Sequence, residues 1–253
     1  MGPDDYKYLF ELEEDFWWFE GMRATTASFL GSFLPAGIDR LILDAGCGTG
    51  QNLNWLEQYA GQGAVTGLDL SSIALAYSRM RGHEKLVLGS SEKLPFEAST
   101  FDFVTSFDVV GQLPDQQACL RAIQEMYRII KPGGLCFLRV AAYSWLHSSH
   151  DEALGTARRY SRSSLSRLFR NAGFRILRKS YLNMLLFPVA ASRRLILKPL
   201  KLSPEGSDVK PLSPFMRALN PALKAALLSE SRLISWGINL PFGLSVVCLA
   251  RKP

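Results

Sequence analysis

Cysteine, histidine and long apolar runs are scarce in this chain of 253 residues, and each shortage excludes a class of protein. The four cysteines are scattered and form no CxxC pair, so neither a disulfide framework nor a zinc site is expected. No apolar run reaches the roughly 18 residues that a membrane span needs, and no signal-peptide pattern is recognised. The composition therefore predicts a cytoplasmic protein without a bound metal.

Charge is distributed unevenly along the chain. Residues 1–120 carry 7 Lys and Arg against 17 Asp and Glu, whereas residues 121–253 carry 22 against 6. A basic half favours an anionic partner, such as a phosphorylated or carboxylated substrate, RNA or a membrane surface. A solvated basic surface without a partner explains the same asymmetry, and composition leaves both interpretations open.

Strand-like and helix-like apolar patterns alternate through the middle of the chain, which predicts an α/β fold. Its core is a Rossmann-like, mostly parallel sheet of seven strands with helices on both faces. Residues 4–34 have a helical pattern with a break at Gly21, and residues 187–236 form a mostly helical insertion that contains a linker-like stretch at 201–214. The predicted strands are 40–46, 64–70, 85–89, 101–107, 135–142, 174–182 and 243–251.

The segment LDAGCGTG (43–50) places three glycines directly after the first predicted strand. Glycines let the backbone turn tightly and approach a ligand, and the helix that follows offers free N–H groups. The GxGxG spacing differs from the GxGxxG of dinucleotide-binding sites, which argues against a dehydrogenase. Asp69 ends the second strand, where an acid can accept hydrogen bonds from a ribose diol.

Four ordered segments resemble motifs of the class I S-adenosylmethionine-dependent methyltransferases: LDAGCGTG, GLDLS, GSSEKLPFEASTFDFV and RIIKPGGLCFL. The resemblance implies S-adenosyl-L-methionine as the cofactor, with its methionine part at the glycine turn and its ribose at Asp69. The family often has Asp at the position of Ser90, where the adenine is met. The implied cofactor-binding residues are Asp44, Gly46, Cys47, Gly48, Gly50, Asn52, Asp69, Leu70, Ser90, Ser91, Glu92 and Phe107.

The resemblance extends to a bacterial subgroup through EDFWWF (14–19) with Arg23, SSHDEALGTARRYS (148–161) and PFGLS (241–245). It implies four parts: an N-terminal helical cap (1–36), the cofactor-binding core (37–186), a helical lid (187–240) and a closing strand of the core (241–253). Where the subgroup pattern has a second histidine, this chain has Thr156.

The segment 148–161 follows the fifth strand, so it is expected at the edge of the sheet where ligands bind. Methyl transfer needs an aligned nucleophile and, for some acceptors, a base. His150 beside Asp151 is the candidate base, and a capped loop is the alternative. Arg158, Arg159 and Tyr160 are candidates for holding an anionic acceptor, with a solvated basic patch as the alternative. The remaining candidates for acceptor binding are Trp18, Arg23, Asp108 and His147.

The predicted function is methyl transfer to a small organic acceptor, anionic or lipid-like, with oxygen favoured over carbon or nitrogen. Two alternatives stand beside it: an RNA or protein methyltransferase that uses the basic half, and a non-catalytic S-adenosylmethionine-binding subunit. No nucleic-acid partner is expected, because no RNA-binding module is recognised. A peripheral membrane or lipid contact stays open, and the sequence gives no oligomeric state.

Overall fold

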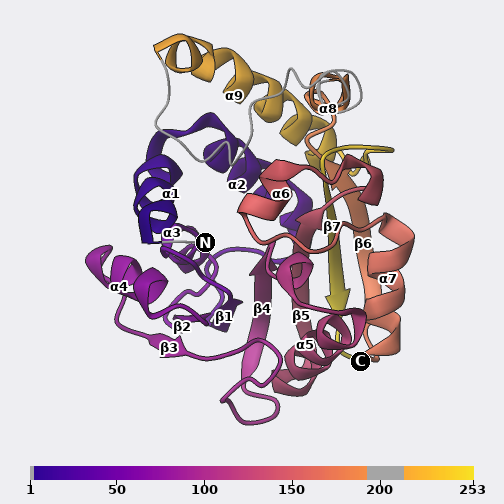
Figure 1. The fold of residues 1–253 in the computed structure, drawn as a ribbon. Helices are drawn as coiled ribbons and strands as arrows, with labels where there is room; N and C mark the ends of the chain where they lie inside the picture. The colour runs from indigo at the N-terminus through magenta and orange to yellow at the C-terminus, as the bar shows by residue number, and fades with distance from the viewer. Residues whose placement is uncertain (1–2, 193–213) are drawn as a thin grey trace.

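A seven-stranded sheet forms the centre of the molecule, with helices on both faces (Figure 1). The computed structural model describes residues 3–192 and 214–253. The strand order is β3-β2-β1-β4-β5-β7-β6, and only β7 runs antiparallel to its neighbours. The predicted fold class is confirmed. The strands are β1 (Leu41–Ala45), β2 (Ala64–Asp69), β3 (Leu86–Leu88), β4 (Phe101–Phe107), β5 (Ile130–Ala141), β6 (Arg175–Leu182) and β7 (Ser245–Arg251).

Helices fill the connections between these strands. The α-helices are α1 (Pro3–Asp15), α2 (Trp17–Leu30), α3 (Gln51–Glu57), α4 (Ser72–Met80), α5 (Gln116–Ile129), α6 (Ser149–Ala153), α7 (Arg162–Asn171), α8 (Phe187–Ser192) and α9 (Pro214–Ser235). Short 3-10 turns are η1 (Gly31–Phe33), η2 (Val110–Gln112) and η3 (Ser144–Leu146).

Two apolar layers hold the helices to the sheet. Neighbouring residues of β4 point to opposite faces, as the period of a strand requires. Val104 joins the layer under α5 and α7, whereas Phe103 joins the layer under α2, α3 and α9. Because both faces are covered, the strands read as nearly continuous apolar runs, and this is why the sequence identifies them.

The helix α5 shows how local sequence sets these elements. Asp115 caps it, since its carboxylate accepts a hydrogen bond from Ala118 N at 2.7 Å. The buried residues recur at helical spacing, which gives α5 one apolar face against the sheet. They are Ala118, Cys119, Ala122, Ile123, Met126 and Ile129.

The predicted helix break at Gly21 is wrong. The break falls at Phe16, and Gly21 lies inside α2, where α9 packs against it. A Cβ at Gly21 would lie 2.4 Å from Leu227 Cδ1, so the glycine admits a neighbouring helix instead of ending its own. A break cannot be distinguished from a close helix crossing until the partner helix is known.

The helical insertion packs as part of the molecule where the structure describes it. Leu227 and Ile234 of α9 are fully buried in the layer that contains Phe29 of α2. The predicted linker at 201–214 lies outside the described residues except for its last position. Among the described helices, none is long and apolar enough to cross a membrane.

Candidate active site

The glycine turn lies at the carboxyl end of β1 and leads into α3. Gly46, Gly48 and Gly50 all have positive φ, at 95°, 57° and 91°. A Cβ at Gly46 would meet Val109 Cγ2 at 2.1 Å, whereas a Cβ at Gly48 would point into open space. Gly48 therefore exposes the backbone of the turn, as close approach of a ligand requires.

Asp69 ties this turn to the end of β2. Its Oδ2 accepts a hydrogen bond from Gly48 N at 2.9 Å, and its Oδ1 accepts one from Ser71 N at 2.9 Å. A carboxylate has further acceptor capacity beyond two such bonds. The carboxylate of Asp69 therefore braces the turn and can still accept hydrogen bonds from a ligand diol.

Asp44 is fully buried beneath the turn. Its Oδ1 accepts a hydrogen bond from Thr105 Oγ1 at 2.9 Å, while its Oδ2 has no partner among the described residues. Burial raises the pKa of Asp44 to about 8, and the Thr105 hydroxyl opposes that rise. An orphaned buried acceptor is the feature that a ligand ammonium would satisfy.

The helix α1 covers the glycine turn through Glu13, a residue that the sequence did not single out. The buried Glu13 carboxyl accepts a hydrogen bond from the Thr49 hydroxyl, and its pKa is raised to about 7 by burial. Arg81 of the loop after α4 fastens the same helix, because Nη2 donates to Phe10 O at 2.6 Å and Nη1 to Glu14 at 2.8 Å.

Arg23 of α2 joins this group. Its Nη2 donates to the Glu13 carbonyl at 3.2 Å, and its Nη1 is buried without a partner among the described residues. The orphaned donor of Arg23 and the orphaned acceptor of Asp44 have the polarities that an α-carboxylate and an α-ammonium need. The residues present therefore fit the amino-acid end of S-adenosylmethionine.

The other residues expected to contact the cofactor lie along the same edge of the sheet. Leu70 follows β2 and is 75% exposed, so it offers an apolar surface where the family resemblance implies the nucleoside. Glu92 is held by Arg121, whose Nη2 donates to Oε2 at 2.6 Å, and Ser91 beside it is buried. Ser90 and Asn52 are partly buried.

Cys47 has a packing role in the described structure. Its side chain is buried with Leu53 and Leu75, and burial raises the pKa of its thiol. A Cβ at Gly67 of β2 would lie only 2.8 Å from Sγ of Cys47. The small side chain therefore fits the turn closely against β2.

Arg139 and Asp108 form an ion pair at the same edge of the sheet. Nε and Nη2 of Arg139 both donate to Asp108 Oδ2, at 2.9 Å and 2.7 Å. The guanidinium carbon lies 5.0 Å from the ring centroids of both Trp18 and Phe107. Asp108 has φ of 64°, a strained backbone that aims its carboxylate at Arg139. Trp18, Phe107 and Asp108 were predicted from the sequence as site residues, whereas Arg139 was not.

The segment 148–161 folds back on itself. Asp151 is 2% exposed: Oδ2 accepts from Ser148 N at 2.8 Å, and Oδ1 accepts from Arg159 Nε at 2.7 Å. Arg159 Nη1 also donates to Ala142 O at 2.9 Å. The acid and the arginine, predicted separately as part of a base and part of an anion clamp, thus neutralise each other and brace the loop.

The remaining residues of this segment are also engaged. His147 Nε2 lies 3.0 Å from the Thr156 carbonyl, and the Tyr160 hydroxyl donates to Cys119 Sγ at 3.1 Å inside the core. Arg158 donates to Leu113 O at 2.8 Å. The structure describes the backbone of His150 in α6 and not its side chain, so the role predicted for this histidine stays a prediction.

A signal in the sequence could have found one of the two missed residues, Arg139, but not Glu13. Arg139 interrupts an otherwise apolar strand, LCFLRVAA, and a charge there needs a partner. Glu13 is one of several acids on an N-terminal helix, and nothing local marks it as the buried one.

Comparison with known proteins shows which family the chain is similar to. A family profile described as a methyltransferase domain matches residues 43–138. The chain is 30% identical over 176 residues to demethylmenaquinone methyltransferase of Listeria monocytogenes, which covers 54% of this chain and 70% of the relative. It is 37% identical over 118 residues to malonyl-[acyl-carrier protein] O-methyltransferase of Pectobacterium atrosepticum, which covers 46% of this chain and 45% of that protein.

A solved structure shares the fold. The S-adenosylmethionine-dependent methyltransferase of Mesorhizobium loti matches with a TM-score of 0.59 and 16% sequence identity. The match covers 90% of this chain and 98% of the other. At this level of identity the likeness concerns the fold alone.

Proposed function

This chain belongs to the class I S-adenosylmethionine-dependent methyltransferases, and from this premise we propose that it methylates a small organic acceptor on an oxygen atom. The observation that carries the proposal is the Arg139–Asp108 pair between the rings of Trp18 and Phe107. This edge offers an aromatic surface with one carboxylate, which suits a compact, partly apolar molecule with an acidic hydroxyl or carboxyl group.

The cofactor, when bound, supplies an electrophilic methyl carbon on a sulfonium. In the proposal Arg23 and Asp44 hold its amino-acid end and Asp69 its ribose. Asp108 receives or holds the proton of the acceptor at its carboxylate, and Arg139 orients that carboxylate through two hydrogen bonds. The rings of Trp18 and Phe107 exclude water from this place. The helices α1 and α2 serve as the cap, and α8 and α9 as the lid.

The names of the relatives support a small acceptor, since one is named for demethylmenaquinone and the other for a malonyl group on a carrier protein. The rings of Trp18 and Phe107 beside Arg139 support it too, because they offer an apolar surface to a small molecule. An RNA or protein acceptor is the second candidate, and it rests on the basic C-terminal half alone.

The test uses purified protein, S-adenosylmethionine with a labelled methyl group, and an extract of the source cells separated into small molecules, lipids, RNA and protein. Label in the small-molecule or lipid fraction supports the proposal, and Asp44→Asn protein serves as the control with weakened cofactor binding. Label in RNA or protein contradicts it. Cofactor binding without any label, across extracts from several growth conditions, would favour a non-catalytic subunit.

The choice of base is a separate question with its own measurement. Once an acceptor is known, Asp108→Asn and His150→Ala are compared for turnover and for cofactor affinity. The proposal expects turnover to fall by at least about tenfold in Asp108→Asn, within the range for loss of a general base. A fall confined to His150→Ala would assign the proton to α6 instead.

A further inference from the structure

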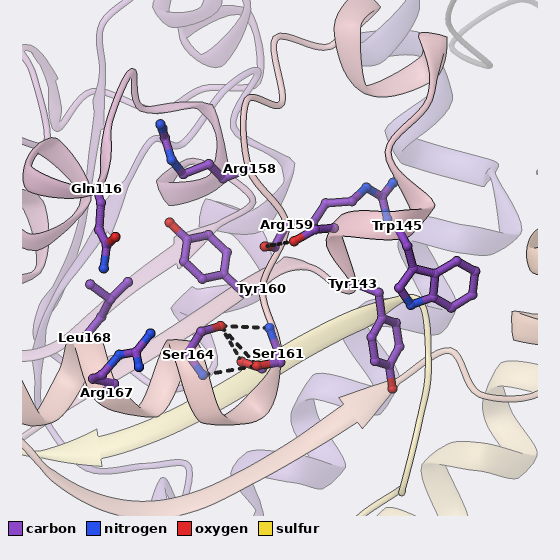
Figure 2. A pocket seen from close by; sticks show the side chains of 11 residues that line it. Gln116, Tyr143, Trp145, Arg158, Arg159, Tyr160, Ser161, Ser164, Arg167 and Leu168 are labelled. Atoms are coloured by element: carbon purple, nitrogen blue, oxygen red, sulfur yellow. Dashed lines mark hydrogen bonds between the residues drawn. The ribbon is translucent and has the colours of Figure 1, made fainter.

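A pocket of about 400 Å³ lies on the side of the sheet that α5 and α7 cover. Figure 2 shows the side chains around it, which come from the loop after β5, the segment 158–161 and α7. Its volume falls within the roughly 300–1,000 Å³ of small-molecule sites. The proposed methyl-transfer function makes no use of it. Its lining residues are Gln116, Tyr143, Ser144, Trp145, Arg158, Arg159, Tyr160, Ser161, Ser164, Arg167 and Leu168.

The backbone of residues 158–160 separates this pocket from the cofactor edge. Arg158 N donates to Gly111 O at 2.9 Å, and Tyr160 N donates to Ala141 O at 2.8 Å. These bonds hold the segment along the ends of β4 and β5. The lining includes neither the glycine turn nor Asp69, Phe107 or Asp108, so the pocket is distinct from the proposed cofactor and acceptor site.

The lining of the pocket is cationic. It contains three arginines and no Asp or Glu. Arg159 is matched by Asp151, whereas neither Arg158 nor Arg167 forms an ion pair with a carboxylate among the described residues. The carboxylate of Asp115 caps α5 by accepting a hydrogen bond from Ala118 N. This hydrogen bond, together with the positive charge of Arg158, lowers the pKa of Asp115. Two guanidinium groups that form no ion pair with a carboxylate in the part of the chain that the structure describes thus border one cavity.

The pocket also has an aromatic side. Trp145 is 52% exposed and lies beside Tyr143, with ring centroids 5.8 Å apart. Tyr143 stacks on Tyr181 of β6 at 5.0 Å, which fixes its ring. In Figure 2 Arg158 lies above Tyr160 and Arg167 below it, while Trp145 and Tyr143 lie to its right. A ligand with an anionic end and a planar end matches this arrangement.

We infer that this pocket binds an organic phosphate monoester, with the phosphate at Arg158 and Arg167 and a planar or apolar group against Trp145. Guanidinium groups hold phosphate oxygens through paired, charge-assisted hydrogen bonds. A dianion is a better match for two unpaired cations than a monoanion. The phosphate can belong to a soluble metabolite or to a lipid headgroup, because the recognition chemistry is the same.

Phenyl phosphate is the first probe, with benzoate as the matched carboxylate. Binding is measured by calorimetry with the full chain and by the change in Trp emission, which Trp145→Phe should reduce. Arg167→Gln is expected to weaken binding of phenyl phosphate by at least about tenfold, as loss of a charge-assisted contact does. Arg170→Gln is the control, because Arg170 is also exposed on α7 and does not line the pocket.

The source of the phosphate is distinguished with vesicles of phosphatidylcholine containing phosphatidic acid. Sedimentation of the protein with these vesicles, lost in Arg167→Gln and kept in Arg170→Gln, identifies a lipid phosphate. Binding of phenyl phosphate without vesicle binding identifies a soluble ligand. The inference is overturned if neither probe binds, if benzoate binds as tightly as phenyl phosphate, or if Arg167→Gln and Arg170→Gln behave alike.

One further measurement tests the phosphate pocket separately from the proposed function. Arg167→Gln should keep the affinity for S-adenosylmethionine within about twofold of the parent chain, because the pocket lies away from the cofactor edge. A large loss of cofactor affinity, with the fold intact by circular dichroism, would contradict a separate site.

Discussion

The donor Nη1 of Arg23 and the acceptor Oδ2 of Asp44 are both buried, and neither has a hydrogen-bond partner among the described residues. Leaving such atoms unsatisfied costs about 1–3 kcal/mol each, so a molecule that pairs with both gains that free energy on binding. In the proposed cofactor site, the two atoms would pair with the carboxylate and the ammonium at the amino-acid end of S-adenosylmethionine.

We expect Arg23→Gln and Asp44→Asn each to weaken S-adenosylmethionine binding by at least about tenfold, equivalent to about 1.4 kcal/mol. Methylthioadenosine lacks the amino-acid end, so its affinity should change by less than about twofold. Calorimetry with both ligands measures the difference. Equal losses for the two ligands would contradict the assignment and indicate a general disturbance of the turn.

Asp69→Ala should also weaken cofactor binding by at least tenfold, on the scale of lost charge-assisted hydrogen bonds. Here both S-adenosylmethionine and methylthioadenosine should be affected, since both carry the ribose. Asp39→Ala is the control, because Asp39 also accepts a backbone N–H, from Gln62 at 2.7 Å, but lies before β1. Unchanged affinity in Asp69→Ala would refute the ribose assignment.

The pH dependence of stability should reveal the buried Asp44. Its pKa is raised from 3.8 to about 8 in the folded chain, so the folded protein keeps a proton that the unfolded chain releases. The free energy of unfolding therefore falls as pH rises from about 4 to about 8. Denaturant unfolding of the ligand-free protein at pH 5.5 and 8.5 measures this.

Asp44→Asn supplies the comparison, because its amide does not titrate. The stability of the variant relative to the parent chain should improve by at least about 1 kcal/mol between pH 5.5 and pH 8.5. Glu13, with its pKa raised to about 7, contributes the same trend in both proteins. A difference that stays constant with pH would show that Asp44 is ionised in the ligand-free fold.

Asp151 should matter to stability more than to cofactor binding. Asp151→Ala leaves Arg159, whose side chain is 5% exposed, as a buried charge without its carboxylate. Loss of one partner of a buried pair costs about 3–5 kcal/mol. The neighbouring Glu152→Ala, an exposed change on the same short helix, should cost less than about 0.5 kcal/mol. Thermal unfolding ranks the two, and similar melting temperatures would disprove the bracing role.

Asp108→Asn tests the acceptor edge once a substrate is known. Cofactor affinity should stay within about twofold, while turnover falls by at least about tenfold. The control is Asp102→Asn at the opposite end of β4, where the carboxylate pairs with Lys131 at 2.8 Å. If the two variants retain equal turnover, the Arg139–Asp108 pair serves the fold and not the reaction.

The sequence predicted the sheet well because its strands are buried on both faces and read as apolar runs. The glycine turn was equally easy to predict, because three glycines in the spacing GxGxG indicate a tight turn that a ligand can approach. The pairing of Arg139 with Asp108 was not visible, because it depends on the register that places Phe107 of β4 opposite Arg139 of β5. Chain spacing carries no information about such register.

The segment 148–161 shows the opposite limit. Its residue types predicted a catalytic cluster, yet Asp151 and Arg159 meet each other across eight residues of chain. Residue types that suit catalysis also suit a braced loop, and only the hydrogen-bond partners distinguish the two. The strand predicted at 135–142 also differs from the structure, because β5 begins earlier, at Ile130, and includes Lys131 to Gly134.

The contact between α2 and α9 joins two helices that are synthesised at different times. Ser28 and Ser231 share a hydrogen bond at 2.7 Å although 203 residues separate them, and Leu227 fills the space that Gly21 leaves. Because α2 precedes α9 in the chain, the side of α2 that faces α9 stays uncovered until α9 has been synthesised. Apolar surface exposed in this way during folding favours aggregation.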